Sequence, residues 1–288
     1  MPTTCPLCNL DRASPLFEKQ GYTLVRCANC ELVWVANPPS TDAIIKLYSF
    51  ESGYHKVVDT HPTTSPVSNR AFNEYRSISH LRTPGRLLDI GCSSGAFLSV
   101  AQANGWAVTG IELSADTARL AREQKGLDVR VGTVFDQEFE EASLDVITLW
   151  DVIEHMPQPG AALERIRHWL KDDGMVVLET PNIGGLFPRV SYRFARMLNY
   201  WPHPEPPGHL FQFSKSTMER LLNKAGYSVM SITDHRIPLA YSFGTIRTLL
   251  GLPKRLAYAM AFAPLAAIGP WVGAGDTIRV IARKSKAT

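Results

Sequence analysis

The chain lacks several features that mark particular classes of protein. Its 30 basic and 27 acidic side chains leave a formal net charge of only +3, which neither demands nor excludes a nucleic acid partner. The sequence begins Met-Pro-Thr-Thr-Cys, without the basic and apolar segments of a secretory signal peptide, so we expect a cytoplasmic protein. Only five of the 288 residues are cysteines, and a chain of this length can bury a hydrophobic core without disulfides.

Long apolar runs are also scarce. Residues 256–275 carry no charge, but Pro264, Gly269 and Pro270 interrupt them. The uninterrupted part is too short to cross a bilayer comfortably, because a spanning helix needs about 20 apolar residues. We therefore expect a buried or interfacial helix in this region.

Four of the cysteines form two CxxC pairs, Cys5 with Cys8 and Cys27 with Cys30. Residues 9–26 separate the pairs, a gap within the range of about 15–20 residues that is typical of a four-thiolate zinc site. Four protein ligands leave no open position on the ion, so the pattern predicts a structural zinc module over residues 1–39. Two unrelated thiol pairs or a disulfide framework are the alternatives, and a reducing location disfavours disulfides.

Downstream of residue 84, short apolar segments alternate with helical patterns. Predicted strands cover residues 86–90, 106–111, 129–131, 144–150, 175–179, 227–232 and 277–282, and helices fill most of the intervals. This alternation predicts an α/β fold: a doubly wound, Rossmann-like, mostly parallel sheet with helices on both faces. The expected organisation is a zinc module at 1–39, a linker and helical cover at 40–84, and the α/β domain at 85–288, with insertions at 182–212 and 237–275.

A glycine turn at residues 89–95 is the main sign of a ligand site. Asp89 ends a predicted strand, and Gly91, Ser93 and Gly95 allow a tight turn whose backbone amides can approach a ligand closely. Glu112 ends the next strand about twenty residues later, where nucleoside-binding folds place the carboxylate that binds the ribose. The three-glycine motif of dinucleotide sites is absent, and Asp89 would repel a pyrophosphate. We therefore expect a nucleoside ligand that carries a cationic amino group.

Five fragments in this order resemble the motifs of the class I S-adenosylmethionine-dependent methyltransferases. They are residues 89–95, 109–114, 132–136, 144–155 and 170–179. The resemblance implies that S-adenosylmethionine is the cofactor, with Glu112 at the ribose and the segment ending in Asp136 near the adenine. The expected cofactor-binding residues are Asp89, Gly91, Cys92, Ser93, Gly95, Glu112, Leu113, Thr133, Val134, Asp136 and Trp150. Ser93 replaces a glycine that is usual in the family, and Cys92 is expected to be a small residue rather than a nucleophile.

Asp151, His155 and His209 are the candidate catalytic residues. Methyl transfer needs chiefly in-line alignment, but a hydroxyl acceptor also needs a base, and histidine has an ordinary pKa near neutrality. Residues 151–155 also resemble the acidic-His loop of ubiquinone-type O-methyltransferases, so a divalent cation or simple bracing of the loop are open alternatives for His155. His209 is expected either at the acceptor or in bracing its own loop. Tyr54 and His55 are weaker candidates for a loop that closes over the cofactor.

Arg189, Arg193 and Arg196 lie on one face of a predicted helix. That face is interpreted in three ways: it is solvated, it meets anionic lipid, or it holds a phosphorylated acceptor. The arginine face and the apolar segment at 256–275 together predict peripheral membrane contact through residues 187–201 and 247–272. The expected acceptor is a small molecule or is linked to a lipid or glycan.

Two other enzyme families also join a zinc module to this core. The chain is similar to sugar C-methyltransferases, but those carry a further C-terminal domain. Little more than the last predicted strand follows residue 275 here, so we expect O-methylation instead. Guanine-N1 methyltransferases of ribosomal RNA are the second family. An RNA enzyme should have a basic module, whereas Arg12, Lys19 and Arg26 are balanced by three acidic residues in positions 1–40, so a nucleic acid partner is not expected. A non-catalytic cofactor-binding protein is the third alternative, and its motifs should be eroded.

Overall fold

The computed structural model describes residues 4–48, 66–198, 201, 203–243, 249 and 251–285. The chain forms two compact units. Unit 1 comprises Met1–Pro38, Glu179–Leu221 and Ser231–Val280, and unit 2 comprises Pro39–Leu178, Leu222–Met230 and Ile281–Thr288.

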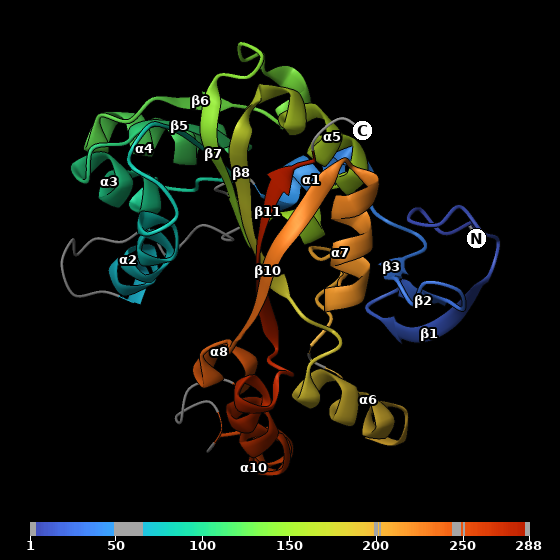
Figure 1. Cartoon of the computed structure of the whole chain (residues 1–288). Helices are drawn as coiled ribbons and strands as arrows, with labels where there is room; N and C mark the ends of the chain where they lie inside the picture. Colours follow the sequence, from blue (N-terminus) through green and yellow to red (C-terminus); the bar gives the residue numbers. More distant parts are fainter. Residues whose placement is uncertain are drawn as a thin grey trace. The chain divides into compact units, whose positions relative to one another are not determined.

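A seven-stranded sheet has the strand order β10-β11-β8-β7-β4-β5-β6, with β4 to β7 wholly in unit 2 and parts of β8, β10 and β11 in unit 1 (Figure 1). The strands are β4 (Arg86–Ile90), β5 (Ala107–Glu112), β6 (Val129–Val131), β7 (Leu144–Trp150), β8 (Leu170–Pro181), β10 (Tyr227–His235) and β11 (Thr277–Lys284). The pairs β4–β5, β4–β7 and β5–β6 are parallel. Every residue of β7 is buried, as its near-continuous apolar sequence predicts for a central parallel strand. The predicted α/β fold is confirmed.

The described helices of unit 2 are α1 (Thr41–Leu47), α2 (Pro66–Ser79), α3 (Ala96–Ala103), α4 (Ala115–Lys125) and α5 (Pro159–Trp169), while α7 (Lys215–Lys224) begins in unit 1. Of these, α3, α4 and α5 follow β4, β5 and β7, as the alternating pattern predicts. The start of α4 is fixed by Ser114, whose side chain accepts a hydrogen bond from the Thr117 backbone amide. Gly126 ends the same helix with φ +63°, a conformation that favours glycine.

Unit 1 contains a four-stranded sheet with the order β1-β2-β3-β9. Its strands are β1 (Ala13–Lys19), β2 (Tyr22–Cys27), β3 (Val33–Val35) and β9 (Phe211–Gln212). The first three strands form the meander that follows from the two cysteine pairs and the segment between them. The fourth strand comes from the predicted insertion at 182–212, because Trp34 pairs with Phe211 in antiparallel register.

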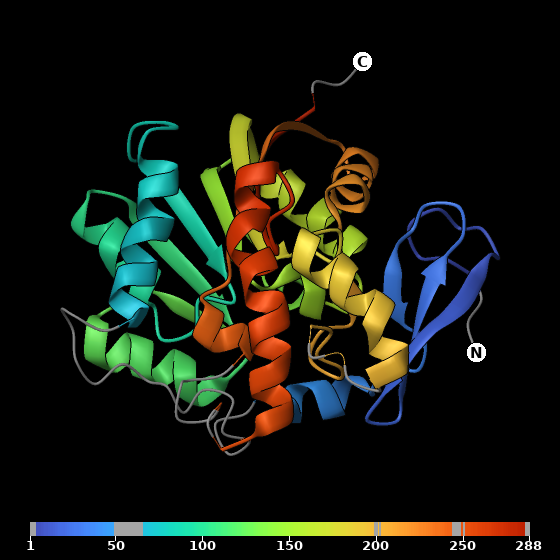
Figure 2. The same ribbon diagram turned by 90° about the horizontal axis from the view of Figure 1, so that it is seen from below.

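The described part of unit 1 also contains helices and a short 3₁₀ segment. They are α6 (Leu186–Leu198), α8 (Leu239–Phe243), α10 (Pro253–Ile268) and η4 (Gly269–Val272). Helix α10 lies against α6, as Figure 2 shows, and the two share an aromatic core that includes Phe187, Phe243, Tyr258 and Phe262. No helix among the described residues is long and apolar enough to cross a membrane.

The contacts group residues 1–38 with parts of both predicted insertions. The β3–β9 pairing accounts for the association of residues 1–38 with the insertion at 182–212, since its backbone hydrogen bonds join positions that are far apart in the sequence. The division of the chain into parts at 1–39, 40–84 and 85–288 stays a prediction.

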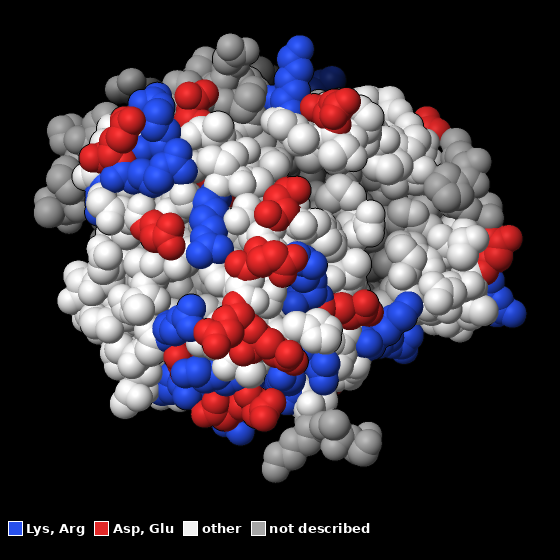
Figure 3. All heavy atoms as spheres, turned by 90° about the horizontal axis from the view of Figure 1, so that it is seen from above, with Lys and Arg blue, Asp and Glu red and all other residues white. Residues whose placement is uncertain are grey.

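Acidic and basic side chains are interleaved on the face drawn in Figure 3. Within unit 2, Arg82 pairs with Asp145 at 3.2 Å and with Asp173 at 3.0 Å, and Arg165 pairs with Glu138 at 2.7 Å. Where its residues are described, that face therefore presents no extended basic surface of the kind that binds nucleic acid.

Candidate cofactor and catalytic site

The turn between β4 and α3 has the backbone geometry that its sequence predicts. Gly91 and Gly95 have φ values of +70° and +72°, in the left-handed region that favours glycine. A Cβ atom on Gly91 would collide with the side chain of Val152, and one on Gly95 with that of Leu127. Ser93 is also left-handed, with φ +49°, which explains physically why a glycine is usual at this position in the family that the turn resembles.

Glu112 is held at this turn by two backbone amides. Its Oε2 accepts a hydrogen bond from the Ser93 N–H at 2.9 Å, and its Oε1 accepts one from the Ser114 N–H at 2.8 Å. The side chain is buried at the end of β5. A carboxylate has about four lone-pair sites, so these two bonds leave capacity for the hydroxyls of a ribose.

Asp89 is buried at the end of β4 and is only 2% exposed. Burial raises the pKa of its carboxyl well above the ordinary value, and the negative charges of Glu74 and Glu112 act in the same direction. A hydrogen bond from Thr148 Oγ1 at 2.7 Å opposes this rise. The site therefore favours a cation that would stabilise the ionised form of Asp89.

Arg70 lies among several of these carboxylates. Its Nε is 2.6 Å from Glu74 Oε1, and its Nη2 is 2.7 Å from Asp151 Oδ2. Burial lowers the pKa of Arg70, but Asp151 and Glu74 outweigh that effect and raise it above the ordinary value, so the guanidinium stays charged. Among the described residues of this network, Arg70 is one cation beside four carboxylates, those of Glu74, Asp89, Glu112 and Asp151. A surplus of negative charge suits a ligand with cationic groups.

The loop after β6 is ordered by its own capping interactions. Asp136 Oδ2 accepts hydrogen bonds from the backbone N–H and the hydroxyl of Thr133, both at 2.7 Å, and these bonds lower the pKa of Asp136. Val134 is buried in the 3₁₀ turn η2 (Val134–Asp136), and Leu113 is half-buried after β5. The loop thus has a fixed shape beside the end of β6.

Two further predicted cofactor residues are buried in the core of unit 2. Trp150 packs edge-on against Phe97, with ring centroids 5.4 Å apart. Cys92 is buried, and burial raises the pKa of its thiol well above the ordinary value, as expected for a packing residue rather than a thiolate nucleophile. Contact of Trp150 and Cys92 with the cofactor stays a prediction.

The loop after β7 contains the candidate base. Asp151 has φ +52°, and the 3₁₀ turn η3 (Ile153–His155) follows it. His155 Nδ1 lies 2.6 Å from the hydroxyl oxygen of Tyr48, at the end of α1. Four residues near these strand ends were not predicted from the sequence: Tyr48, Arg70, Glu74 and Thr148. Thr148 lies within the fragment 144–155, whereas Tyr48, Arg70 and Glu74 lie far from the motifs along the chain, and only the fold brings them to the strand ends.

The other predicted catalytic residue, His209, belongs to unit 1. It precedes β9, and its backbone N–H donates to the Glu205 carbonyl at 2.9 Å. Its role at the acceptor stays a prediction. Tyr54 and His55 lie outside the described residues.

The four paired cysteines converge in unit 1. Their sulfur atoms all lie within 4.8 Å of one another, with Cys5 Sγ 3.4 Å from Cys30 Sγ and Cys8 Sγ 3.6 Å from Cys27 Sγ. The two turns are alike: Asn9 N–H donates to the Cys5 carbonyl, and Glu31 N–H donates to the Cys27 carbonyl. The thiols are not joined in disulfides.

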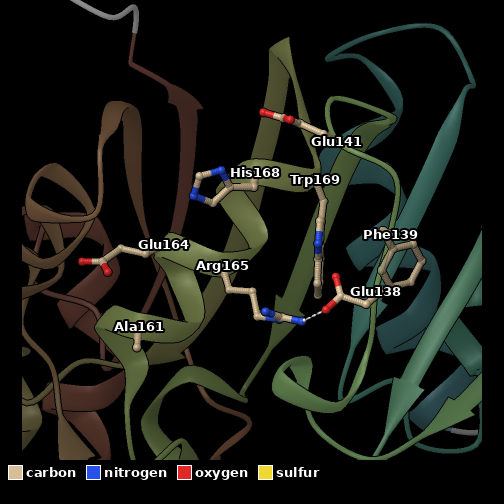
Figure 4. A pocket seen from close by; sticks show the side chains of 8 residues that line it. All are labelled: Glu138, Phe139, Glu141, Ala161, Glu164, Arg165, His168 and Trp169. Atoms are coloured by element: carbon tan, nitrogen blue, oxygen red, sulfur yellow. Dashed lines mark hydrogen bonds and ion pairs between the residues drawn. The ribbon is translucent and has the colours of Figure 1, made fainter.

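A separate open cavity of about 470 Å³ lies in unit 2. Figure 4 shows its lining residues, Glu138, Phe139, Glu141, Ala161, Glu164, Arg165, His168 and Trp169. Arg165 is bonded to Glu138 at 2.7 Å and lies 5.6 Å from the ring centre of Trp169. None of the predicted cofactor or catalytic residues lines this cavity.

Residues 67–232 match the family described as "Methyltransferase domain". The chain belongs to this methyltransferase family. The matched segment contains all eleven predicted cofactor-binding residues, and the resemblance to S-adenosylmethionine-dependent methyltransferases is confirmed.

Curated relatives of this methyltransferase include two proteins named "Ubiquinone biosynthesis O-methyltransferase". The one from Xylella fastidiosa (strain M23) is 29% identical over 162 residues, which are 50% of this chain and 65% of the relative. The one from Glaesserella parasuis serovar 5 (strain SH0165) is 30% identical over 107 residues, or 34% of this chain and 45% of the relative. The matches thus span less than two thirds of these relatives.

Solved structures share the fold of this methyltransferase at low sequence identity. A SAM-dependent methyltransferase from Archaeoglobus fulgidus has a TM-score of 0.54 at 19% identity and covers 76% of this chain and 95% of its own. A possible histamine N-methyltransferase from Thermotoga maritima also has a TM-score of 0.54, at 18% identity, and covers 81% of this chain and 98% of its own. These likenesses confirm the Rossmann-like architecture.

Proposed function

We propose that this methyltransferase transfers the methyl group of S-adenosylmethionine to an oxygen atom of a small-molecule acceptor. The observation that carries the proposal is the Tyr48–His155 hydrogen bond at the loop after β7, which orients a candidate base beside the charged network of Arg70 and Asp151. The names of the curated relatives, which are O-methyltransferases, support oxygen as the accepting atom.

The charge and hydrogen-bonding capacity of these unit 2 residues support binding of the cofactor here. The turn at Gly91 and Gly95 has no room for a Cβ, and Glu112 has lone pairs available for ribose hydroxyls. Asp89 and the surplus of carboxylates would hold the cationic amino group. When bound, the sulfonium group supplies an electrophilic methyl carbon.

His155 would act as the general base. If Nδ1–H donates its hydrogen bond to the Tyr48 oxygen, the ring has the tautomer whose basic lone pair is on Nε2. His155 Nε2 then accepts the proton of the acceptor hydroxyl as that oxygen becomes methylated. Tyr48 is a positioning residue in this scheme, because it acts through the orientation and tautomer of His155.

We further propose that the four converging thiols of unit 1 bind one zinc ion as thiolates. Their mutual separation and the two matching turns are those of a closed, four-coordinate structural site. The ion would stabilise the β1–β3 meander and take no part in methyl transfer.

The test is methyl transfer by the full chain with tritium-labelled cofactor. The acceptor panel contains catechols, simple phenols, carboxylic acids, amines and ribosomal RNA. We expect label in the phenol or catechol fraction, as base-stable ethers. Label confined to the amines or to RNA would overturn oxygen methylation of a small molecule.

Variants of the base separate catalysis from cofactor binding. With a labelled phenol, His155→Gln should lower kcat by about 10²–10⁴, the usual contribution of a general base, without weakening S-adenosylhomocysteine binding. Tyr48→Phe should lower kcat by about tenfold and shift the pH profile of kcat, with little change in KM. The matched control is His168→Gln, since His168 is an exposed histidine of α5. A His155→Gln variant with the control's kcat would exclude His155 as the base.

A further inference from the structure

Helix α10 is apolar on its exposed side as well as its buried side. Tyr258, Phe262 and Ala266 are buried in the aromatic core of unit 1. On the opposite side Met260 is 66% exposed and Ile268 is 50% exposed. A surface helix of a globular protein ordinarily carries polar residues on its solvent side, so this exposed side needs another explanation.

The apolar exposure continues beyond the end of α10. In η4, Trp271 is 90% exposed and Val272 also projects into solvent. On the neighbouring helix α6, Phe194 is exposed, and its ring centre lies 6.0 Å from that of Phe262. We call the exposed side chains of Phe194, Met260, Ile268, Trp271 and Val272 the apolar face. Exposed aromatic and aliphatic groups that lie together mark an interaction surface.

The sequence segments that carry the apolar face hold charges of one sign, and the ion pair of Asp234 with Lys215 lies close to Gly273 at the edge of the face. Residues 182–204 and 237–275 contain no aspartate or glutamate and six lysines or arginines: Arg189, Arg193, Arg196, Arg247, Lys254 and Arg255. Arg189 and Arg193 are exposed on α6, and Lys254 and Arg255 are exposed at the start of α10. The side chains of Arg196 and Arg247 lie outside the described residues.

The geometry points to an anionic lipid bilayer as the partner of this surface. Apolar side chains would enter the boundary between head groups and acyl chains while neighbouring cations contact the phosphates. Tryptophan is enriched at that depth, because its ring is apolar and its N–H can meet polar head groups. No described helix is long and apolar enough to span the bilayer, so α10 would lie along it. This inference does not depend on the identity of the methyl acceptor.

Sedimentation with sucrose-loaded vesicles tests the inference on the full chain. One vesicle set is phosphatidylcholine alone, and the other is phosphatidylcholine mixed with phosphatidylglycerol. We expect binding to the mixed vesicles that weakens as salt is raised, and much weaker binding to phosphatidylcholine. Equal binding to both sets, or to neither, would overturn the inference.

Two pairs of variants assign the binding to the apolar face and to its cations. Met260→Ser with Trp271→Ser should weaken binding by about tenfold or more, because both side chains leave the lipid. The matched control is Met230→Ser, since Met230 is 46% exposed on β10 in unit 2. Lys254→Gln with Arg255→Gln should weaken binding by about twenty-fivefold at low salt, at about fivefold for each cation. Their control is Arg119→Gln with Arg220→Gln, two exposed arginines on α4 and α7.

The main competing explanation is that the apolar face joins two copies of the chain. Sedimentation velocity without lipid distinguishes the two cases. One outcome would overturn the lipid as partner: the unaltered chain is a dimer that does not bind vesicles, and the Met260→Ser, Trp271→Ser variant is a monomer. The apolar face would then bind a second copy of the chain. Thermal melts and S-adenosylhomocysteine binding confirm that each variant is folded, so lost vesicle binding cannot be attributed to unfolding.

Discussion

The two compact units differ in the charge that they concentrate. Unit 2 buries Glu74, Asp89 and Glu112 near the guanidinium of Arg70, the one cation of this network among the described residues. In unit 1, the sequences of α6 and α10 carry cations and no acidic residue. Each sign matches the ligand proposed for that region: a cofactor with cationic groups for unit 2 and an anionic surface for unit 1. The small net charge of the whole chain conceals this difference.

The units also differ in how the chain builds them. Most of unit 2 is one stretch, Pro39–Leu178, in which β4, β5 and β7 are followed by α3, α4 and α5. Unit 1 is assembled from three separated stretches and contains the four-cysteine cluster. We therefore expect unit 2 to depend on its hydrophobic core, and the β1–β3 part of unit 1 to depend on a bound ion.

The largest expected effect is loss of the ion. Structural zinc sites contribute on the order of 10 kcal/mol to the folding of small modules, so Cys27→Ser should abolish zinc binding and the protection of β1–β3 against hydrogen exchange. Elemental analysis and hydrogen exchange by mass spectrometry measure both. Cys92→Ser is the matched control and should retain one zinc ion per chain. If Cys27→Ser also abolished S-adenosylhomocysteine binding, unit 2 would depend on the ion as well, contrary to this expectation.

The next effect concerns the carboxylate at the end of β5. Glu112→Gln should weaken S-adenosylhomocysteine binding by about a hundredfold, because hydrogen bonds to a charged group contribute about 1.5–3 kcal/mol each. Isothermal titration calorimetry gives the affinity, with Glu123→Gln on the exposed side of α4 as the control. Unchanged affinity would remove Glu112 from the cofactor site.

A smaller effect is expected from Asp89, with a defined dependence on pH. Because its pKa is raised in the folded protein, the native state binds more protons than the unfolded state above pH about 3.9, and the cofactor-free protein loses stability as pH rises towards the raised value. Asp89→Asn should remove that dependence and weaken S-adenosylmethionine binding by about tenfold. Melting curves over a pH series provide the measurement. The same slope in the variant and the unaltered chain would contradict a raised pKa at Asp89.

The smallest effect is expected at the cap of α4. Ser114→Ala removes the acceptor for the Thr117 amide and should cost about 1 kcal/mol, a fall in Tm of about 2–4 °C for a domain of this size. Calorimetry measures the shift, and zinc content should not change. Zinc loss in this variant would show that the stability of unit 2 governs the module in unit 1.

The sequence was sufficient to predict those parts of the fold that are encoded locally. Strand and helix periodicity predicted β4 to β7 and their helices, because each segment carries its own pattern. Cysteine spacing predicted the convergence of the four thiols. The left-handed turn at Gly91 and Gly95 was predictable as well, since few residues other than glycine adopt that backbone conformation.

The missed features depend on contacts between distant segments. Arg70 meets Asp151 across 81 positions, and Tyr48 meets His155 across 107. No local pattern reports such pairs, although the spacing of Arg70 and Glu74 on one helix face was a signal that their side chains would interact. The pairing of β9 with β3 was missed for the same reason, because a strand of two residues carries no periodicity.

That short β9 strand has a consequence for the order of events during synthesis. All four cysteines and the first three strands of the unit 1 sheet are synthesised before the β4–β7 core of unit 2, so their thiols can capture an ion before that core forms. The sheet stays incomplete at β3 until Phe211 and Gln212 have been made, after the whole β4–β7 core of unit 2. The newborn chain therefore carries an open sheet edge at β3 until β9 is made, and an exposed edge of this kind can pair with other chains during that interval.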